Sequence, residues 1–339
     1  MMFAGFAGVW TPAAMARELR QKPVSVTIAA ERIVLFRGAQ GQPAALIDRC
    51  PHRGVALSLG AVTPEGALAC PFHGWEYGPD GLCSHIPLND LPADKRRRAK
   101  AMALPVREVG GMIWVYTGTD VAAPPPLHVP GALTEPGWVL WHYAETWDCH
   151  WTRAMENMLD MPHVPYLHRR TIGRGMRRRI TRDSRMTMHV EPTEYGMAIR
   201  NDLDGVRTSG FLEWHRPNGM ALYILPPESK RGFRQHMWCV PVDEIHTRMM
   251  LVSARTFGGD NPISRLFDQF NRIILGEDRN VVQSTLPKVC PHPSEEMSVA
   301  TDAPTLAFRR YYFNTLHESR WPLAEPPLGP PAEHRHGTP

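Results

Sequence analysis

The chain has 339 residues, of which 43% are hydrophobic and 21% are charged. These fractions are typical of a soluble globular protein, so they exclude compositional disorder and do not indicate a membrane class. The net charge of +4 is small, and no DNA- or RNA-binding signature accompanies its basic clusters, which argues against a nucleic-acid partner. A chain of this length is expected to form two domains, each with its own core.

The amino-terminal residues, Met1 to Trp10, are mildly apolar but lack the basic start and the long apolar run of a signal peptide. No apolar run in the chain approaches the roughly 18 residues that a membrane-spanning helix requires. We therefore expect a cytoplasmic protein without a membrane partner. Four cysteines occur without pairing spacing and are expected to remain thiols, buried as small apolar residues: Cys83, Cys149, Cys239 and Cys290.

The first third of the chain is predicted to be mainly β-structure, after a short helix over residues 12–20. Apolar and polar residues then alternate with the period of a strand, and Gly78-Pro79-Asp80-Gly81 predicts a hairpin turn. The chain up to about residue 118 therefore predicts a small all-β module. Its expected strands cover residues 24–28, 33–35, 44–48, 67–69 and 112–116.

Two short loops of this module carry metal-binding residue types. They read Cys50-Pro51-His52-Arg53-Gly54 and Cys70-Pro71-Phe72-His73-Gly74-Trp75, with seventeen residues between His52 and Cys70. Two thiolates and two imidazoles in this pattern predict a four-ligand metal site. Structural zinc usually takes its cysteines and histidines in like pairs. One cysteine and one histidine in each loop suit a [2Fe–2S] cluster that two loops hold from opposite sides.

The spacing of these residues, C-x-H-x17-C-x2-H, resembles the Rieske iron–sulfur motif. The proline and glycine residues beside the ligands favour tight turns that aim backbone N–H groups at the cluster sulfurs. The resemblance implies that Cys50, His52, Cys70 and His73 hold the cluster. It covers the amino-terminal third of the chain.

A stiff proline run, Pro124 to Pro126, marks the expected domain boundary, because no helix or central strand would contain it. Helical spacing follows over residues 147–159. Directly after it come Asp160, His163 and His168. Asp160 and His163 are three residues apart and would share one face of a helix. Two such histidines could equally be core residues. A metal site is therefore predicted only if another part of the chain supplies a third ligand.

A long helix nearer the carboxyl end offers that ligand. Asn261 is a natural amino-terminal cap, Pro262 suits the first helical position, and the pattern continues to about Thr285. Glu277 falls inside the apolar stripe of this helix and Asp278 at its edge. A carboxylate there is expected to be paired, hydrogen-bonded or bound to a metal. Two histidines and one carboxylate form the facial triad of non-haem Fe(II) oxygenases. The predicted stripe consists of Ile263, Leu266, Phe267, Phe270, Ile273, Ile274 and Val281.

Taken together, the order of these motifs resembles the catalytic α subunit of Rieske non-haem iron oxygenases. The resemblance implies that His163, His168 and Asp278 bind mononuclear Fe(II) and that Asp160 carries electrons toward it. Asn157 or Glu156 is expected beside the ligands, and the sequence leaves that choice open. The implied fold is α+β: an all-β Rieske domain over residues 1–120, then a catalytic domain over 121–331 with a curved antiparallel sheet flanked by helices. The density of prolines near the carboxyl end of the chain predicts a disordered tail over residues 332–339.

The implied activity is an O₂-dependent oxygenation. No G-x-G-x-x-G follows a strand, so no nicotinamide or flavin site is expected, and NAD(P)H would act only through a separate reductase or ferredoxin. Short members of this family that lack a β subunit favour hydroxylation or oxidative O- or N-demethylation of an apolar or aromatic molecule. The alternatives are ring cis-dihydroxylation, a Rieske electron carrier with a ligand-binding domain, and a lipid-binding module. The family also implies a head-to-tail homotrimer, in which His52 or His73 approaches Asp160 of the next subunit.

Overall fold

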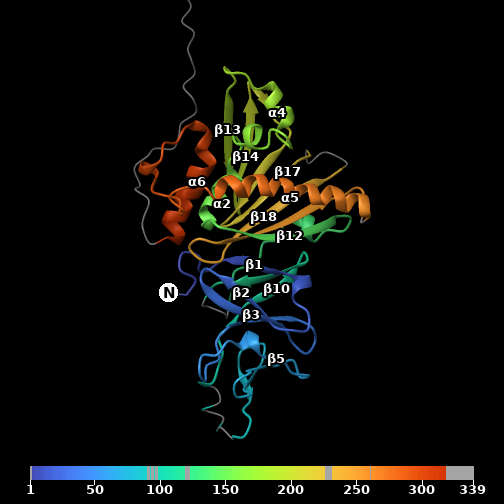
Figure 1. The fold of residues 1–339 in the computed structure, drawn as a ribbon, viewed down its shortest axis with the longest axis vertical. Coiled ribbons are helices and arrows are strands. Elements are labelled where there is room, and N and C mark those ends of the chain that lie inside the picture. The colour runs from blue at the N-terminus through green and yellow to red at the C-terminus, as the bar shows by residue number, and fades with distance from the viewer. Residues whose placement is uncertain are drawn as a thin grey trace, which may run out of the picture.

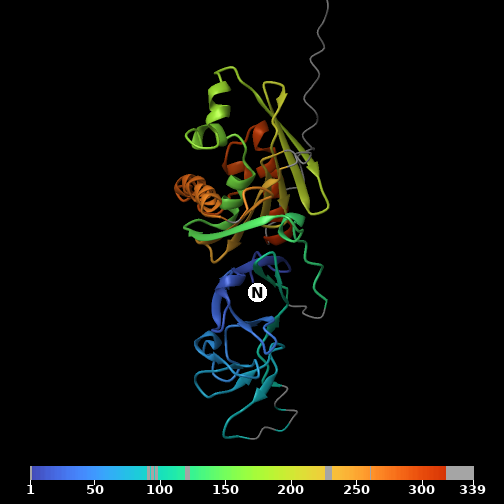
Figure 2. The ribbon, with the colours of Figure 1, turned by 90° about the vertical axis from the view of Figure 1, so that its right-hand side faces the viewer.

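A computed structural model describes residues 2–89, 92, 95, 98–118, 123–225, 231–259 and 261–317 of the chain. The molecule is elongated, with the amino-terminal β-structure at one end and a helix-covered sheet at the other (Figure 1, Figure 2). The predicted tail over residues 332–339 lies outside the described residues. Within the described part of the chain, no helix combines the length and apolar character needed to cross a membrane.

The amino-terminal part consists of three small antiparallel sheets, as the alternating pattern predicts. Two short 3₁₀ turns, Ala16–Glu18 and Leu57–Leu59, interrupt them. The sheets have the orders β1-β11-β10, β2-β3-β4-β9 and β5-β6-β7-β8. The strands are β1 (Trp10–Met15), β2 (Val24–Ile28), β3 (Glu31–Arg37), β4 (Pro43–Ile47), β5 (Ala61–Val62), β6 (Leu68–Ala69), β7 (Glu76–Tyr77), β8 (Cys83–His85), β9 (Ala103–Leu104), β10 (Val106–Val109) and β11 (Met112–Tyr116).

The predicted helix over residues 12–20 is wrong, because strand β1 covers residues 12–15 and only a short 3₁₀ turn follows it. Its alanine, methionine and leucine residues favour a helix in isolation. Pairing with β11 buries them instead, since Ala13, Ala14 and Met15 are at most 2% exposed. β1 lies at the edge of its sheet, and the pairing register shifts just after Pro12. An edge strand with a bulge is a place where proline is tolerated. Tertiary pairing therefore overrides local propensity here.

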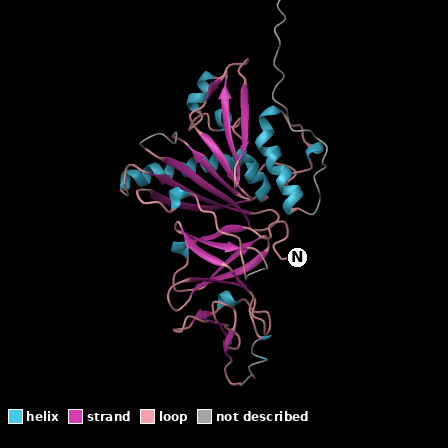
Figure 3. Ribbon diagram, turned by 180° about the vertical axis from the view of Figure 1, so that it is seen from behind, coloured by secondary structure: helices cyan, strands magenta, loops and turns pink. Residues whose placement is uncertain are grey.

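The second part of the chain forms one eight-stranded antiparallel sheet with helices against it, as the resemblance implies (Figure 3). Its strand order is β12-β19-β18-β17-β16-β14-β13, and the short β15 pairs with β14. The strands are β12 (Val139–Trp147), β13 (Met186–Pro192), β14 (Gly196–Leu203), β15 (Val206–Arg207), β16 (Phe211–His215), β17 (Gly219–Tyr223), β18 (Phe233–Pro241) and β19 (Thr247–Arg255).

The long predicted helix is present as α5. Its cap is the predicted one, since the Asn261 side chain accepts a hydrogen bond from the backbone N–H of Ser264 at 3.0 Å. The helix predicted over residues 147–159 begins four residues later, because Trp147 ends strand β12. The α-helices are α2 (Trp151–Leu159), α3 (Val164–Leu167), α4 (Arg174–Arg179), α5 (Pro262–Val282) and α6 (Ala303–Tyr311), and shorter turns cover Gly131–Leu133, Pro293–Glu295, Ala300–Asp302 and Tyr312–Leu316.

The predicted orientation of α5 is wrong. Leu266 and Ile273, from the predicted apolar stripe, are 73% and 57% exposed. The face that packs on the sheet instead contains Asp268, Asn271 and Asp278, all at most 5% exposed. A polar face can be buried when its groups have partners, and the sheet and α2 supply them. The apolar side of α5 is therefore left at the surface of the single chain.

The two parts of the molecule share one hydrophobic core. Trp114 of β11 meets Trp238 of β18 edge to face with ring centroids 5.2 Å apart, and Asn218 donates a hydrogen bond to Thr11 across the junction at 3.0 Å. A second, smaller core lies under the two cysteine–histidine loops. The proline joint is fastened to the first part, since the Trp10 indole donates to the carbonyl oxygen of Pro125 at 2.7 Å.

Candidate functional site

The two cysteine–histidine loops have the same backbone design. In each loop the cysteine N–H donates to the carbonyl oxygen five residues later, Val55 or Trp75, at 2.8 Å. In each, the glycine four residues after the cysteine donates back to the cysteine carbonyl, at 2.8 Å from Gly54 and 3.0 Å from Gly74. Both glycines have positive φ, 76° and 69°, which other residues adopt only with strain. The repeated glycine thus closes both loops.

These loops bring all four predicted cluster residues together. Cys50 and Cys70 are buried in the small core, and the His52 and His73 rings lie 4.7 Å apart at the outer side. The His52 ring also stacks on Trp75, with centroids 4.4 Å apart and planes 6° from parallel. The Cys50 Sγ lies 3.3 Å from the hydroxyl of Tyr77, a contact that sequence reasoning did not identify.

The geometry fits an iron–sulfur cluster. The Nδ1 atom of His52 is buried and has no hydrogen-bond partner within the described ranges. Leaving a buried polar atom unpaired costs about 1–3 kcal/mol, which a bond to iron would offset. Two sulfur donors in the core and two imidazoles at the rim are the donor set of a Rieske cluster. All six cysteines of the chain are buried thiols, so none is consumed by a disulfide.

A second group of ligand-type atoms meets between α2, α3 and α5. His163 and His168 lie at the two ends of the short helix α3, which begins after the break at Asp160 that Pro162 favours. Asp278 reaches them from α5. The Nε2 atoms of the two histidines are 3.3 Å apart, and Asp278 Oδ1 lies 3.5 Å from His163 Nε2 and 3.2 Å from His168 Nε2. Three ligand atoms that close together form a potential cation site.

The other ring nitrogens face carboxylates. His163 Nδ1 lies 3.2 Å from Asp160 Oδ2, and His168 Nδ1 lies 2.7 Å from Glu277 Oε2. Burial lowers the pKa of His168, but the hydrogen bonds and charges of Asp278 and Glu277 raise it above its ordinary value overall. Carboxylates in this position orient metal-binding histidines and raise their basicity. Thr171 donates to the same Glu277 oxygen at 2.7 Å.

Sequence reasoning missed this role of Glu277. It placed the residue inside an apolar stripe, whereas Glu277 contacts His168, which is 109 residues away in the chain. A signal was present, since a second carboxylate stands directly before Asp278 on the same helix. Only the packing of α5 on α3 shows that the two neighbouring carboxylates contact one histidine from different sides.

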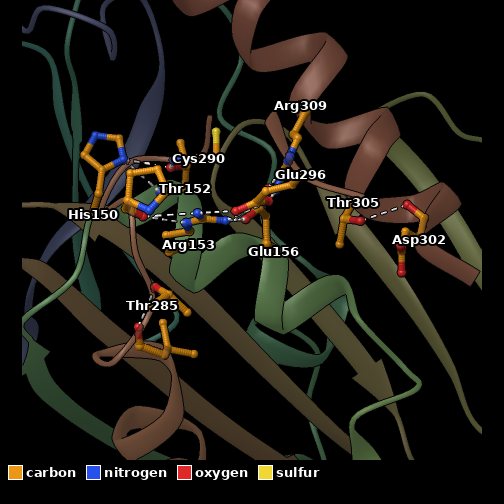
Figure 4. Close-up of polar contacts among 12 residues, drawn as sticks. His150, Thr152, Arg153, Glu156, Thr285, Cys290, Glu296, Asp302, Thr305 and Arg309 are labelled. Atoms are coloured by element: carbon orange, nitrogen blue, oxygen red, sulfur yellow. Dashed lines mark hydrogen bonds and ion pairs between the residues drawn. The ribbon is translucent and has the colours of Figure 1, made fainter. Parts of the chain in front are cut away.

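The choice between Asn157 and Glu156 is resolved by the contacts of α2. Asn157 Nδ2 donates to Asp278 Oδ1 at 3.0 Å, so Asn157 is the residue beside the ligands. Glu156 points the other way, into a buried ion-pair network (Figure 4). It pairs with Arg153 at 3.0 Å and with Arg309, and both arginines also pair with Glu296 at 2.6 Å.

This network fixes α2 against the carboxyl-terminal part of the chain (Figure 4). Burial lowers the pKa of Arg309, but its contacts with Glu156 and Glu296 raise it overall, so the guanidinium stays charged. Thr152 of α2 also accepts a hydrogen bond from the Cys290 backbone at 3.2 Å. These contacts hold α2, the helix that carries Asn157, against α6 and against the loop that contains Cys290.

Two family models match the two parts of the chain that hold these residues. Residues 9–95 match the Rieske [2Fe–2S] domain, and residues 147–317, half of the chain, match the vanillate O-demethylase oxygenase C-terminal domain. The chain belongs to the Rieske oxygenases. Members of this family carry a [2Fe–2S] cluster and a mononuclear iron and use O₂.

Several relatives of this Rieske oxygenase are known proteins. It is 28% identical to chlorophyllide a oxygenase of Chlamydomonas reinhardtii over 97% of its own length, but spans only 51% of that protein. It is 28% identical to the dicamba O-demethylase oxygenase component of Stenotrophomonas maltophilia, over 75% of this chain and 79% of that one. A 3-chlorobenzoate-3,4-dioxygenase oxygenase subunit of Comamonas testosteroni is 34% identical over 47% of this chain and 37% of its own.

Solved structures share the fold. A dicamba monooxygenase bound to dicamba has a TM-score of 0.75 with 23% identity, covering 90% of this chain and 96% of the other. A Pseudomonas putida CBB5 NdmA variant with caffeine also has a TM-score of 0.75, with 24% identity and 90% and 89% coverage. At this level of identity the likeness concerns the architecture of both parts of the Rieske oxygenase.

Proposed function

We propose that the chain is an O₂-dependent oxygenase that hydroxylates an apolar or aromatic small molecule or removes its O- or N-methyl group by oxidation. The observation that carries this proposal is the convergence of His163, His168 and Asp278 on one point. A chain with only the cysteine–histidine loops would be an electron carrier and would have no use for this triad. Dicamba O-demethylase, one of the relatives, removes a methyl group, which supports demethylation as the favoured reaction.

The roles of the residues follow from their contacts. Cys50, His52, Cys70 and His73 would hold the cluster, and the triad would hold Fe(II). When bound, this iron supplies sites at which O₂ can be activated with electrons from the cluster. Asp160 and Glu277 fix the two histidine rings with Nε2 turned inward, and Asn157 holds one oxygen of Asp278 in place. Three protein ligands would leave other coordination positions of the iron for O₂.

The electrons would come from a separate reductase or ferredoxin, which would take them from NAD(P)H. We further propose that residues 1–120 form the Rieske domain and residues 121–331 the catalytic domain. The cluster loops and the triad lie in different parts of the chain (Figure 1), which favours transfer between neighbouring subunits. A head-to-tail homotrimer would supply that route as a closed ring.

Exposed apolar side chains near both centres support such a ring. Phe72, beside His73, is 59% exposed, and Tyr166, between the two triad histidines on α3, is also 59% exposed. Their rings are available for contact with a second copy. In the proposed ring, His52 or His73 of one subunit approaches Asp160 of the next. The apolar side of α5 offers further area for such a contact.

One relative favours a second candidate reaction. The 3-chlorobenzoate-3,4-dioxygenase subunit resembles nearly half of this chain, so ring cis-dihydroxylation is the alternative. Product analysis separates the two reactions, because demethylation releases formaldehyde and dihydroxylation forms a cis-diol with both oxygen atoms from ¹⁸O₂. The test is turnover with a surrogate reductase on methoxy- and methylamino-aromatic compounds. If protein with both metal centres filled forms no formaldehyde, no hydroxylated product and no cis-diol, the proposed function is contradicted.

The ring is tested by mixing two inactive chains. A Cys70→Ala chain lacks the cluster and a His163→Ala chain lacks the mononuclear iron. Verified mixed trimers would contain junctions where an intact cluster of one chain faces an intact triad of the next, and these should regain activity. Separate homotrimers, mixed without subunit exchange, serve as the control. No recovery in verified mixed trimers would contradict the route between subunits.

A further inference from the structure

On the buried face of α5, Asn271 carries a polar atom that neither an ion pair nor the iron site accounts for. Asp268 forms a two-bond ion pair with Arg255 at 3.0 and 2.8 Å, and Asp278 belongs to the triad. Asn271 accepts a hydrogen bond from Gln235 Nε2 of β18 at 2.6 Å. Its own Nδ2, however, is buried and has no partner among the residues that the structure describes. Such a group destabilises the folded chain unless something binds it.

A second unpaired group lies beside it. Ser253 of β19 stands directly opposite Gln235 of β18 in the sheet, and its side chain is fully buried. The Ser253 hydroxyl also finds no partner in the described part of the chain. Side chains directly opposite each other on adjacent strands have Cβ atoms about 5 Å apart. Gln235, Asn271 and Ser253 therefore form one polar cluster between α5 and the sheet.

This cluster lies on the same side of α5 as the triad. Asn271 and Asp278 are seven residues apart, which is two turns, or about 10.5 Å along the axis, with nearly the same direction. The apolar Leu275, 2% exposed, lies between them. A molecule that places its reacting group at the triad could extend past an apolar middle to the polar cluster. The distance between Asn271 and Asp278 along the helix is comparable to the length of one substituted aromatic ring.

We propose that Gln235, Asn271 and Ser253 bind a neutral hydrogen-bonding group of the substrate, such as a carboxamide, a ring carbonyl or a hydroxyl, at the end away from the oxidised carbon. This inference rests on the proposed function of the triad. The three side chains supply amide and hydroxyl donors and acceptors and no charge. A buried carboxylate would need a cation. Arg255, the buried cation two residues from Ser253, is already held by Asp268.

Equilibrium binding tests this without requiring turnover. Protein with both metal centres filled is titrated in a calorimeter, with O₂ excluded, with the three isomers of methoxybenzamide, methoxytoluene and methoxybenzoate. At least one benzamide is expected to bind tenfold or more tightly than its toluene and benzoate counterparts. A Gln235→Met, Asn271→Leu double variant should lose this preference. Gln269→Leu, which removes an exposed amide from the same helix, should keep it.

Thermal unfolding separates a binding role from a structural one. Removing unpaired buried groups should leave the unfolding temperature of the double variant unchanged or higher. A lower unfolding temperature of the double variant, with the amide preference intact, would show that the polar cluster between α5 and the sheet only supports the fold. No preference for any benzamide in the unmodified protein would overturn the inference. A preference that depends on this polar cluster, but without any oxygenated or demethylated product from the complete system, would count against the proposed function and leave this inference standing.

Discussion

The two candidate metal centres of this chain are built in opposite ways. The cluster loops span residues 50–75, and each is closed by its own backbone hydrogen bonds and its own glycine. The triad joins residues that are more than a hundred positions apart, such as His168 and Asp278. A locally closed site depends little on distant packing, whereas an assembled site depends on every element that positions it. Substitutions far from the iron ligands should therefore affect the triad and leave the cluster intact.

Glu156→Gln should give the largest effect. It leaves Arg153 and Arg309 buried with only Glu296 as a carboxylate partner, and breaking such a pair should destabilise the catalytic domain by about 3 kcal/mol. The mononuclear iron should bind less well because α2 carries Asn157, while the cluster spectrum should not change. Chemical denaturation and iron analysis measure both, with the exposed Glu295→Gln as the control. Equal loss of iron from both centres would contradict the claim that only the triad depends on distant packing.

Asp160→Ala should reduce turnover by about a hundredfold, because it removes the carboxylate that orients His163. Both metal centres should still fill when iron is supplied in excess, since neither cluster residues nor triad ligands are changed. Steady-state rates with iron and sulfide content on the same samples measure this. Asp148→Ala, an exposed carboxylate before the same helix, is the matched control. A variant that keeps its full rate would show that Asp160 has no part in the reaction.

Glu277→Gln should weaken binding of the mononuclear iron by about tenfold, a free-energy change of about 1.4 kcal/mol. The glutamine keeps the shape of the side chain but removes the charge beside His168 Nδ1. Iron titration of the apo triad, with the cluster intact, measures the change. If iron affinity is unaltered, the contact between Glu277 and His168 does not support the ligand.

Tyr77→Phe should have the smallest effect, and only at the cluster. The hydroxyl lies 3.3 Å from Cys50 Sγ, and a hydrogen bond there favours the more negative, reduced cluster. A difference of about 1 kcal/mol corresponds to roughly 40 mV for one electron, so the potential should fall by about that amount. Protein-film voltammetry measures it, and the iron affinity of the triad should not move. An unchanged potential would show that this contact does not tune the cluster.

The sequence predicts the two centres unequally for the same reason. Spacing alone predicted that Cys50, His52, Cys70 and His73 come together, as they do in the structure, because the loops are local. The sequence also predicted Asp278 as a ligand from the cost of burying a carboxylate, and it predicted the cap at Asn261, which the structure contains. It could not choose between Asn157 and Glu156 or find Glu277, because these depend on how α2, α3 and α5 pack. The rotation of α5 away from its predicted orientation has the same origin, since polar partners on neighbouring elements decide which face is buried.

Metal content in three forms of the protein tests the central claim most directly. Iron and acid-labile sulfide would be measured, with Mössbauer spectra, in the unmodified protein and in the Cys70→Ala and His163→Ala variants. We predict about three irons and two sulfides per unmodified chain, one iron without sulfide in Cys70→Ala, and two irons with two sulfides in His163→Ala. Three irons in His163→Ala, or loss of iron from both centres in either variant, would contradict two separately built metal sites.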